Sequence, residues 1–271
     1  MWGGLLNQSS STSCRASTNL PCWPKIAVAV HIGYEDKKIA AELLHCAQMI
    51  QAECRHCDIY ITAVHEEMVQ WAKREYPDVT TFLVENRGVD VLGFLHILKR
   101  VSNTHHYIFK LHTKSDLTFR RLLLHNFIAD RIQVRATLQI LLQPGVGMVL
   151  SKARRVEPVF VAPALQWMQS MGWPVADVEK TTTIVRQAQF SGGAFFAASV
   201  SVLWRGMRRV DTRLEALQSP VGRGYALGPL HRLYLYERLW GICAAVFSRQ
   251  VYCRNEPYSE SELFLSPFHL K

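Results

Sequence analysis

Residues 81–116, TFLVENRGVDVLGFLHILKRVSNTHHYIFKLHTKSD, decide the fold of this chain. An apolar run at residues 81–84 stops at the polar turn of residues 85–88, and apolar side chains then recur at helical spacing over residues 91–101. A second apolar run, residues 107–111, ends in another polar cluster. The pattern predicts one strand–helix–strand unit with polar side chains at the carboxyl ends of two adjacent strands, where ligands bind in open parallel sheets.

The same alternation of short apolar runs and amphipathic stretches covers the N-terminal half of the chain. Strands are expected at residues 26–32, 58–64, 81–84, 107–111 and 146–150, and helices at residues 37–52, 66–75, 91–101 and 120–142. This order favours an α/β fold with a mostly parallel, doubly wound sheet and helices on both faces. Beyond residue 151 the expected elements are a Gly-interrupted strand at 190–198, a basic helix at 203–217, a Gly-rich loop at 222–228 and a helix at 230–247.

The chain of 271 residues is long enough for one α/β domain, which we place at residues 25–253, with two small domains as the alternative. Residues 1–24 lack both a long apolar core and a basic start, so they predict a disordered leader, with a Ser-rich transit peptide as the alternative. Residues 254–271 are expected to form a surface tail. No run of about 18 apolar residues occurs, so no membrane-spanning helix is expected.

The seven cysteines are odd in number and scattered, which favours a reducing, cytoplasmic setting. Cys54 and Cys57 have the spacing of half a zinc site, but no second pair follows at a fitting distance, so we expect ordinary buried thiols at a helix end. The net charge of +9 suits an anionic ligand, a nucleic acid or an anionic membrane surface. The basic run at residues 205–213 lacks interleaved aromatic residues, so a solvated or membrane-facing helix is expected there and no nucleic-acid partner.

A group of basic side chains is predicted to surround the carboxyl edge of the sheet. It consists of Arg87, Lys110, His112, Lys114, Arg120 and Arg121. Gly88 would let the backbone approach a ligand closely, and Asp90 is placed to cap the next helix, whose N-terminus favours an anion. A diphosphate is the ligand that such a rim favours. The alternative is that Lys114, Arg120 and Arg121 are solvated surface charges.

Two motifs of the central unit resemble the rhamnan synthesis protein F family, GT-A-like proteins of polysaccharide assembly. They are Glu85-Asn86-Arg87-Gly88-x-Asp90 and Lys110-x-His112-Thr113-Lys114-Ser115, with weaker matches at His31, Tyr34, Thr62, Gly147, the Gly-Gly-Ala-Phe-Phe run, and His231 with Glu237-Arg238-Leu239. The resemblance covers roughly residues 25–250. It implies a GT-A-like glycosyltransferase that moves rhamnose or another deoxysugar from a nucleotide-sugar donor to a glycan or lipid-linked acceptor, in the cytoplasm or at a membrane face.

The resemblance also implies roles for single residues. Donor-binding roles fall to His31, Tyr34, Asn86, Arg87, Asp90, Lys110 and Arg120, and catalytic roles to Lys114, His112 and Glu237. GT-A enzymes usually hold a divalent metal with an Asp-x-Asp motif, whereas this chain has His112-Thr113-Lys114, which offers at most one good metal ligand. We therefore expect metal-independent chemistry without a cofactor, in which basic side chains stabilise the departing diphosphate. Asp116 is the alternative metal ligand.

Glu237 is expected to deprotonate the acceptor hydroxyl. The alternative is a local salt bridge with Arg232 or Arg238 on a surface helix, and His231 lies one or two turns earlier. Two rival functions stay open at this point. A non-catalytic module that binds nucleotide sugars or glycans would lack a carboxylate facing Lys114. A nucleic-acid-binding protein would rely on charge alone and show steeply salt-dependent binding.

Overall fold

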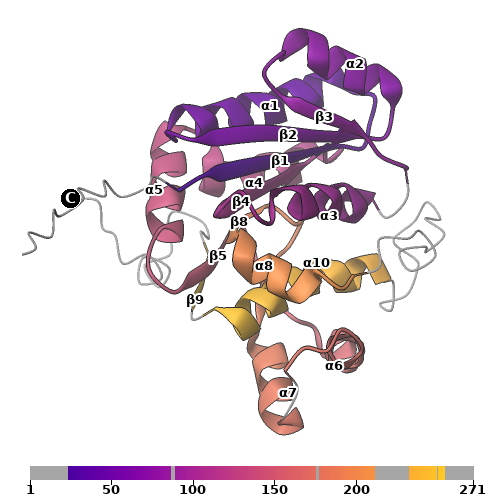
Figure 1. Ribbon diagram of the computed structural model, residues 1–271, viewed down its shortest axis with the longest axis vertical. Coiled ribbons are helices and arrows are strands. Elements are labelled where there is room, and N and C mark those ends of the chain that lie inside the picture. Colours follow the sequence, from indigo (N-terminus) through magenta and orange to yellow (C-terminus); the bar gives the residue numbers. More distant parts are fainter. Residues whose placement is uncertain (1–23, 87–88, 175–176, 211–231, 249, 254–271) are drawn as a thin grey trace, which may run out of the picture.

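The computed structural model describes residues 24–86, 89–174, 177–210, 232–248 and 250–253. These residues form a seven-stranded sheet of order β3-β2-β1-β4-β8-β5-β9 and a separate two-stranded ribbon (Figure 1). The strands of the large sheet are β1 Ile26–Ile32, β2 Cys57–Ala63, β3 Thr80–Leu83, β4 Tyr107–His112, β5 Val146–Leu150, β8 Phe196–Ser199 and β9 Gln250–Cys253. The ribbon pairs β6 Ala153–Arg155 with β7 Gln189–Ser191.

Most of the large sheet is parallel. β3, β2, β1 and β4 are parallel neighbours, and β5 and β9 form a second parallel pair. β8 lies between β4 and β5 and is antiparallel to both. The expected α/β fold with a mostly parallel sheet is therefore confirmed.

Helices cover both faces of the sheet. They are α1 Lys37–Ala52, α2 Glu66–Glu75, α3 Val89–Val101, α4 Leu117–Ile128, α5 Arg131–Leu141, α6 Pro158–Ser170, α7 Val178–Gln187, α8 Val200–Met207 and α10 Arg232–Phe247. Successive side chains of a strand point to opposite faces, so β1 serves two separate cores. Ala27 and Ala29 pack with α3, α8 and α10, whereas Val28 and Val30 pack with α1, α4 and α5.

Residues 120–142 form two helices, so the prediction of one long helix was wrong. Asp116 accepts a hydrogen bond from the Phe119 backbone N–H at 2.9 Å and caps α4. Asp130 accepts from the Gln133 N–H at 2.8 Å and caps α5. A side-chain cap satisfies backbone donors that a helix start leaves unpaired, so each aspartate begins a helix of its own.

Two predictions about the strands also need correction. The expected strand at residues 190–198 divides into β7 and β8, because Gly193 (φ +95°) and Ala194 (φ +58°) adopt left-handed backbone conformations that a strand cannot contain. The two polar clusters do not end adjacent strands, because β2 and β1 lie between β3 and β4. Their carboxyl ends still share one edge, since all four strands run in the same direction.

Several expectations fall on residues that the structure does not describe. These are the disordered leader apart from residue 24, the C-terminal tail, the Gly-rich loop at 222–228, and the part of the expected basic helix from residue 211 onward. The described part of that helix ends at Met207, so residues 208–210 do not continue it as expected. Among the described helices, none combines the length and the hydropathy needed to cross a bilayer.

Candidate functional site

Hydrogen bonds tie the ends of β1, β2 and β4 together at the carboxyl edge. The Thr113 N–H donates to the His31 carbonyl at 2.9 Å, and the Gly33 N–H donates to Thr113 Oγ1 at 2.8 Å. The buried His31 ring contacts Thr62 Oγ1 through Nδ1 at 3.0 Å. Burial lowers the pKa of His31 to about 4, so the ring is neutral. These contacts fix the loops from which the candidate site residues project.

Helix α3 lies directly over this edge because it carries a glycine at the contact. A Cβ added at Gly93 would come within 2.5 Å of both His31 Nδ1 and Thr62 Oγ1. The absence of a side chain lets the first turns of α3 approach the sheet closely. The approach places Asp90, in the first turn of α3, next to β4.

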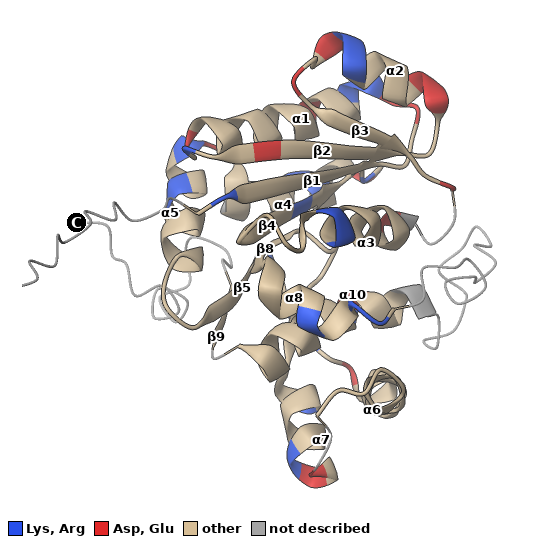
Figure 2. Ribbon diagram, in the orientation of Figure 1, with Lys and Arg blue, Asp and Glu red and all other residues tan. Residues whose placement is uncertain are grey.

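Asp90, Lys110 and His112 form a buried polar cluster. The Asp90 carboxylate pairs with Lys110 Nζ through Oδ2, and its Oδ1 lies 3.3 Å from His112 Nδ1. The described strands of the large sheet carry charged side chains only at Asp58 and Lys110; Figure 2 shows how rare such residues are there. Lys110 is 1% exposed, so its charge is not part of a solvated rim. A buried charge of this kind requires a partner, which Asp90 supplies.

The cluster also holds the left-handed turn between β7 and β8. Lys110 Nζ donates to the Ala194 carbonyl at 3.2 Å, and His112 Nε2 contacts the Gly193 carbonyl at 2.7 Å. A carbonyl oxygen only accepts, so Nε2 carries the proton of the His112 ring. Ala194 is a non-glycine residue at positive φ, a conformation that persists where surrounding contacts enforce it. Two side chains of β4 thus fix a turn that lies about eighty residues further along the chain.

The protonation states follow from burial and from the mutual charges. Burial lowers the pKa of His112 to about 3, although Asp90 opposes the shift, so the ring is neutral near pH 7. Burial also lowers the pKa of Lys110, against the attraction of Asp90. Burial by itself raises the pKa of Asp90, but the neighbouring basic groups, of which Lys110 is the one in direct contact that is charged near pH 7, hold that pKa well below its ordinary value. The cluster is therefore a buried Lys110–Asp90 ion pair beside a neutral imidazole.

Lys114 follows β4, acts electrostatically on Asp90 and His112, and is more exposed than Lys110 or His112. Its backbone carbonyl accepts a hydrogen bond from Arg120 Nη1, and Arg120 Nε donates to Glu42 Oε2 at 2.9 Å. Arg120 is buried, so in the structure it supports the Lys114 loop instead of facing solvent.

Glu237, in α10, joins the same edge from a distant part of the chain. Burial raises the pKa of its carboxyl, and Asp90 raises it further, while Lys114, Arg238 and Lys110 lower it. These charges act on Glu237 because the structure brings α10 next to the cluster. The expected salt bridge with Arg238 is also present, with Nη1 2.9 Å from Glu237 Oε2. Glu237 thus has both a local partner and a place at the site.

Arg238 is itself firmly held, which fixes the position of Glu237. Its guanidinium binds Glu157 through two contacts, of 2.6 and 3.0 Å. The guanidinium carbon lies 4.4 Å from the centres of both the Phe160 and the Phe190 rings. Arg238 therefore joins α10 to the start of α6 and to β7.

The remaining predicted residues lie in different places. Tyr34 is 46% exposed at the loop after β1, and Asn86 is exposed at the start of a gap in the described chain. Arg87 and His231 lie outside the described residues, as does the side chain of Arg232. Asp116 uses its carboxylate to cap α4. Within the described ranges, no three His, Cys, Asp or Glu side chains gather in a way that could hold a metal ion.

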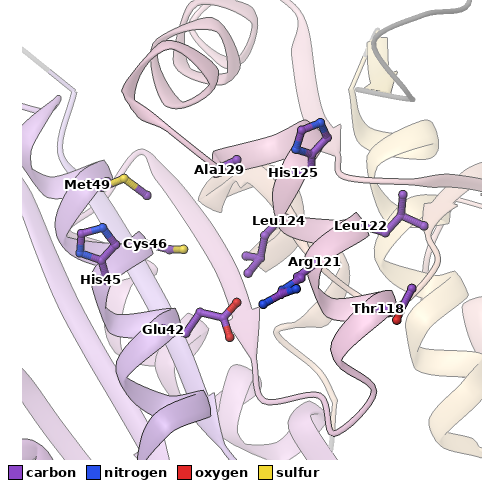
Figure 3. A pocket seen from close by; sticks show the side chains of 10 residues that line it. All are labelled: Glu42, His45, Cys46, Met49, Thr118, Arg121, Leu122, Leu124, His125 and Ala129. Atoms are coloured by element: carbon purple, nitrogen blue, oxygen red, sulfur yellow. The ribbon is translucent and has the colours of Figure 1, made fainter.

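Arg121 lines a groove of about 580 Å³ between α1 and α4 (Figure 3). Glu42 and Arg121 face each other across it, and His45 and His125 lie on opposite walls. The predicted cationic rim is therefore not one continuous surface. Lys110 and Arg120 are buried, Arg121 lines the groove, and Lys114 is more exposed than the two buried residues.

Sequence reasoning missed the residues that organise the site. Gly93 stands in an apolar helical run, and an isolated glycine there signals a close packing contact. The Gly192-Gly193-Ala194 run signalled a special backbone, but not its contacts with Lys110 and His112. Nothing local marked Glu157 as the partner of Arg238.

The fold and this edge define an α/β protein with a buried ion pair beneath a lysine and a glutamate. The family model for rhamnan synthesis protein F matches residues 6–156, more than half of the chain, and the chain belongs to this family. The family that the sequence motifs indicated is thereby confirmed, whereas the weaker motif matches beyond residue 156 lie outside the matched range. The matched segment contains Asp90, Lys110, His112 and Lys114 but not Glu237. No curated protein matches the chain.

Proposed function

We propose that this protein is a GT-A-like glycosyltransferase of rhamnan-type polysaccharide synthesis. It would move rhamnose or another deoxysugar from a nucleotide-sugar donor to a glycan or lipid-linked acceptor. The proposal is supported by the mutual electrostatic influence of Lys114, Glu237 and the Asp90–Lys110 pair, at the carboxyl edge of parallel strands in a chain of the rhamnan synthesis protein F family. Such edges are where α/β sheets bind their ligands.

Each of the two residues has a distinct role in this proposal. The Glu237 carboxylate takes the proton of the acceptor hydroxyl, whose oxygen attacks the anomeric carbon of the donor as the bond to the nucleoside diphosphate breaks. Lys114 stabilises the negative charge that develops on that diphosphate. Arg120 keeps the lysine in place through the Lys114 carbonyl. The raised pKa of Glu237, caused first by burial, makes its carboxylate a stronger base.

The divalent metal usual in GT-A enzymes does not fit the donor set at this position. His112 donates Nε2–H to the Gly193 carbonyl, Asp116 caps α4, and Lys114 adds a positive charge. Hard divalent cations prefer several oxygen ligands. The proposed steps therefore use side-chain charge alone.

The direct test compares Lys114→Ala with Lys99→Ala. Lys99 is an exposed lysine in the last turn of α3, nine residues from Asp90 and toward the other edge of the sheet. Consumption of nucleotide-sugar donors should fall about 10²-fold in Lys114→Ala, because one well-placed charge is lost from the transition state. It should be unchanged in Lys99→Ala, and the melting temperature should change little in either. Equal turnover in Lys114→Ala and the parent protein would contradict the assignment.

A non-catalytic module that binds nucleotide sugars or glycans is the second candidate. The observation in its favour is the 2.9 Å contact that occupies Glu237 Oε2 with Arg238. Such a module would bind UDP or dTDP in calorimetry without consuming any donor. Binding to random DNA that falls steeply with salt, with no affinity for nucleotide diphosphates, would instead indicate a nucleic-acid-binding protein.

We also propose that the protein works in the cytoplasm and contacts a membrane face when it meets a lipid-linked acceptor. The net charge of +9 supports attraction to anionic lipids. Sedimentation with phosphatidylserine vesicles at low and high salt measures this contact. Equal sedimentation with neutral vesicles would contradict it.

A further inference from the structure

Two cysteines lie at the edge of the sheet opposite the candidate site. Cys54 follows the C-terminal end of α1, and Cys57 is the first residue of β2. β2 therefore begins at the amino edge, whereas Lys114 follows the carboxyl end of the parallel strand β4 (Figure 1). The cysteine pair is separate from the proposed sugar-transfer site.

Hydrogen bonds fix the backbone on both sides of the pair. The Cys54 N–H donates to the Gln51 carbonyl at 3.1 Å, and Gln51 Nε2 donates to the Cys57 carbonyl at 3.1 Å. The Ile26 N–H donates to the His56 carbonyl at 2.9 Å, and Cys57 pairs with Ile26 in the β1–β2 register. The four-residue loop is thus closed at both ends.

The start of the loop has an additional anchor. Glu53, which ends α1, forms ion pairs with Arg131 and Arg135 of α5. The side chain of Glu53 is 7% exposed, so these contacts hold it firmly. The residue directly before Cys54 is therefore immobilised by a neighbouring helix.

The two cysteines lie three positions apart at the ends of this anchored loop, and both residues are only partly buried. Cys46, Cys243 and Cys253 are buried, so among the described cysteines this pair is the more accessible to a small reagent. Hydrogen bonding with Cys57 lowers the pKa of Cys54, and hydrogen bonding with Cys54 is the first cause that raises the pKa of Cys57. Cys54 is thus the better nucleophile.

We propose that Cys54 and Cys57 form a dithiol site that exchanges with small disulfides of aliphatic thiols and closes to an intramolecular disulfide. The Cys54 thiolate attacks one sulfur of the small disulfide, which releases one small thiolate and leaves a mixed disulfide on Cys54. Cys57 then attacks Sγ of Cys54, breaking the mixed bond and releasing the second small thiolate. The protein loses two protons and two electrons, and the small disulfide gains both as it becomes two thiols.

The influences on the Cys54 thiol act in opposite directions. Burial and the negative charge of Glu53 oppose a thiolate at Cys54, as does the C-terminal end of α1, but hydrogen bonding with Cys57 outweighs them and the pKa of Cys54 is lowered. Within the described residues no third ligand joins the pair to make a metal site.

The test treats the native full-length protein with oxidised glutathione, blocks the remaining thiols after denaturation, and maps tryptic peptides. Trypsin cleaves after Arg55, between the two cysteines, so residues 39–55 and 56–73 stay joined only through a disulfide. The first peptide also contains Cys46, and fragment ions distinguish it from Cys54. We expect joined peptides with the bond at Cys54. Separate peptides that both carry the blocking group at saturating oxidant would overturn the proposal.

Two serine variants separate the steps. Cys57→Ser should stop at a stable mixed disulfide, with one glutathione on Cys54. Cys54→Ser, in which only Cys57 of the pair can react, should take up glutathione at least about tenfold more slowly than Cys57→Ser, because the thiolate is the attacking species. Equal rates for the two variants would contradict the assignment of Cys54 as nucleophile. The double variant, at the edge remote from the site, should keep the parent's melting temperature in reducing buffer and form no bond between these peptides.

Discussion

Replacing Lys110 by methionine tests whether the buried ion pair organises the site. Methionine keeps a long apolar stem between Phe94 and Phe196, whose ring centres lie 5.5 and 5.9 Å from Lys110 Nζ. The substitution removes the cation that faces Asp90 and the donor to the Ala194 carbonyl. The Asp90 carboxylate therefore stays buried without its charged partner, while the packing changes little.

The expected loss is large because the Asp90 side chain is only 9% exposed. Removing one partner of a buried ion pair costs about 3–5 kcal/mol, since the other charge stays buried and uncompensated. For a domain of this size that corresponds to a fall in melting temperature of about 6–20 °C. Asp90→Asn in the Lys110→Met background should recover at least about 2 kcal/mol, because the uncompensated charge is then gone.

The pH dependence gives an independent signature. In the parent protein the pKa of Asp90 is held well below its ordinary value of 3.8. The ionised Asp90 therefore stabilises the fold at higher pH, and this contribution to the free energy of unfolding is lost as pH falls. Lys110→Met removes one of the charges that lower the pKa of Asp90, so this pKa should be higher in the variant than in the parent. The variant's deficit in unfolding free energy relative to the parent should therefore shrink as pH falls.

Urea unfolding followed by tryptophan fluorescence measures the parent, both single variants and the double variant over a range of pH. A loss below about 1 kcal/mol for Lys110→Met, or no recovery on adding Asp90→Asn, would refute the ion pair as an organising element. A deficit that grows as pH falls would refute the assigned direction of the Asp90 pKa.

Three further predictions concern the site and its frame. Glu237→Gln should lower donor consumption about 10²-fold. In the parent, the rate should fall on the acid side with a midpoint above pH 4.5, because burial first and Asp90 second raise the pKa of Glu237. A midpoint at or below that value would contradict the assignment of Glu237 as the base. Gly93→Ala should lower the free energy of unfolding, measured by urea titration, by about 1–3 kcal/mol, because the new methyl group overlaps His31 and Thr62. Gly33→Ala is the control: its Cβ meets nothing nearer than 3.5 Å, so the same free energy should change by less than about 0.5 kcal/mol. Calorimetric binding of UDP or dTDP should survive EDTA, and a loss that Mg²⁺ restores would show that a carboxylate holds an ion.

Periodicity in the sequence was enough to predict the α/β class, the first four strands and the shared edge at which the candidate site residues gather. Apolar spacing reports which face of an element is buried, and the direction of parallel strands places their carboxyl ends together. The paired central motifs also indicated the rhamnan synthesis protein F family, which the family match confirms.

Strand adjacency and partner choice needed the tertiary structure. The antiparallel β8 lies between β4 and β5, and β3 and β4 are separated by two strands, because pairing joins segments that local spacing cannot relate.

The chain alone also made Lys110, His112 and Arg120 look like one cationic surface. In the structure Lys110 and His112 are buried and hold the turn at Gly193 and Ala194 by hydrogen bonds. Arg120 donates hydrogen bonds to Glu42 and to the Lys114 carbonyl. The sequence determined which charges stand at this edge, through residue type and strand direction. Only the tertiary structure decided which of them stay near solvent, because desolvation and pairing depend on segments far away in the chain.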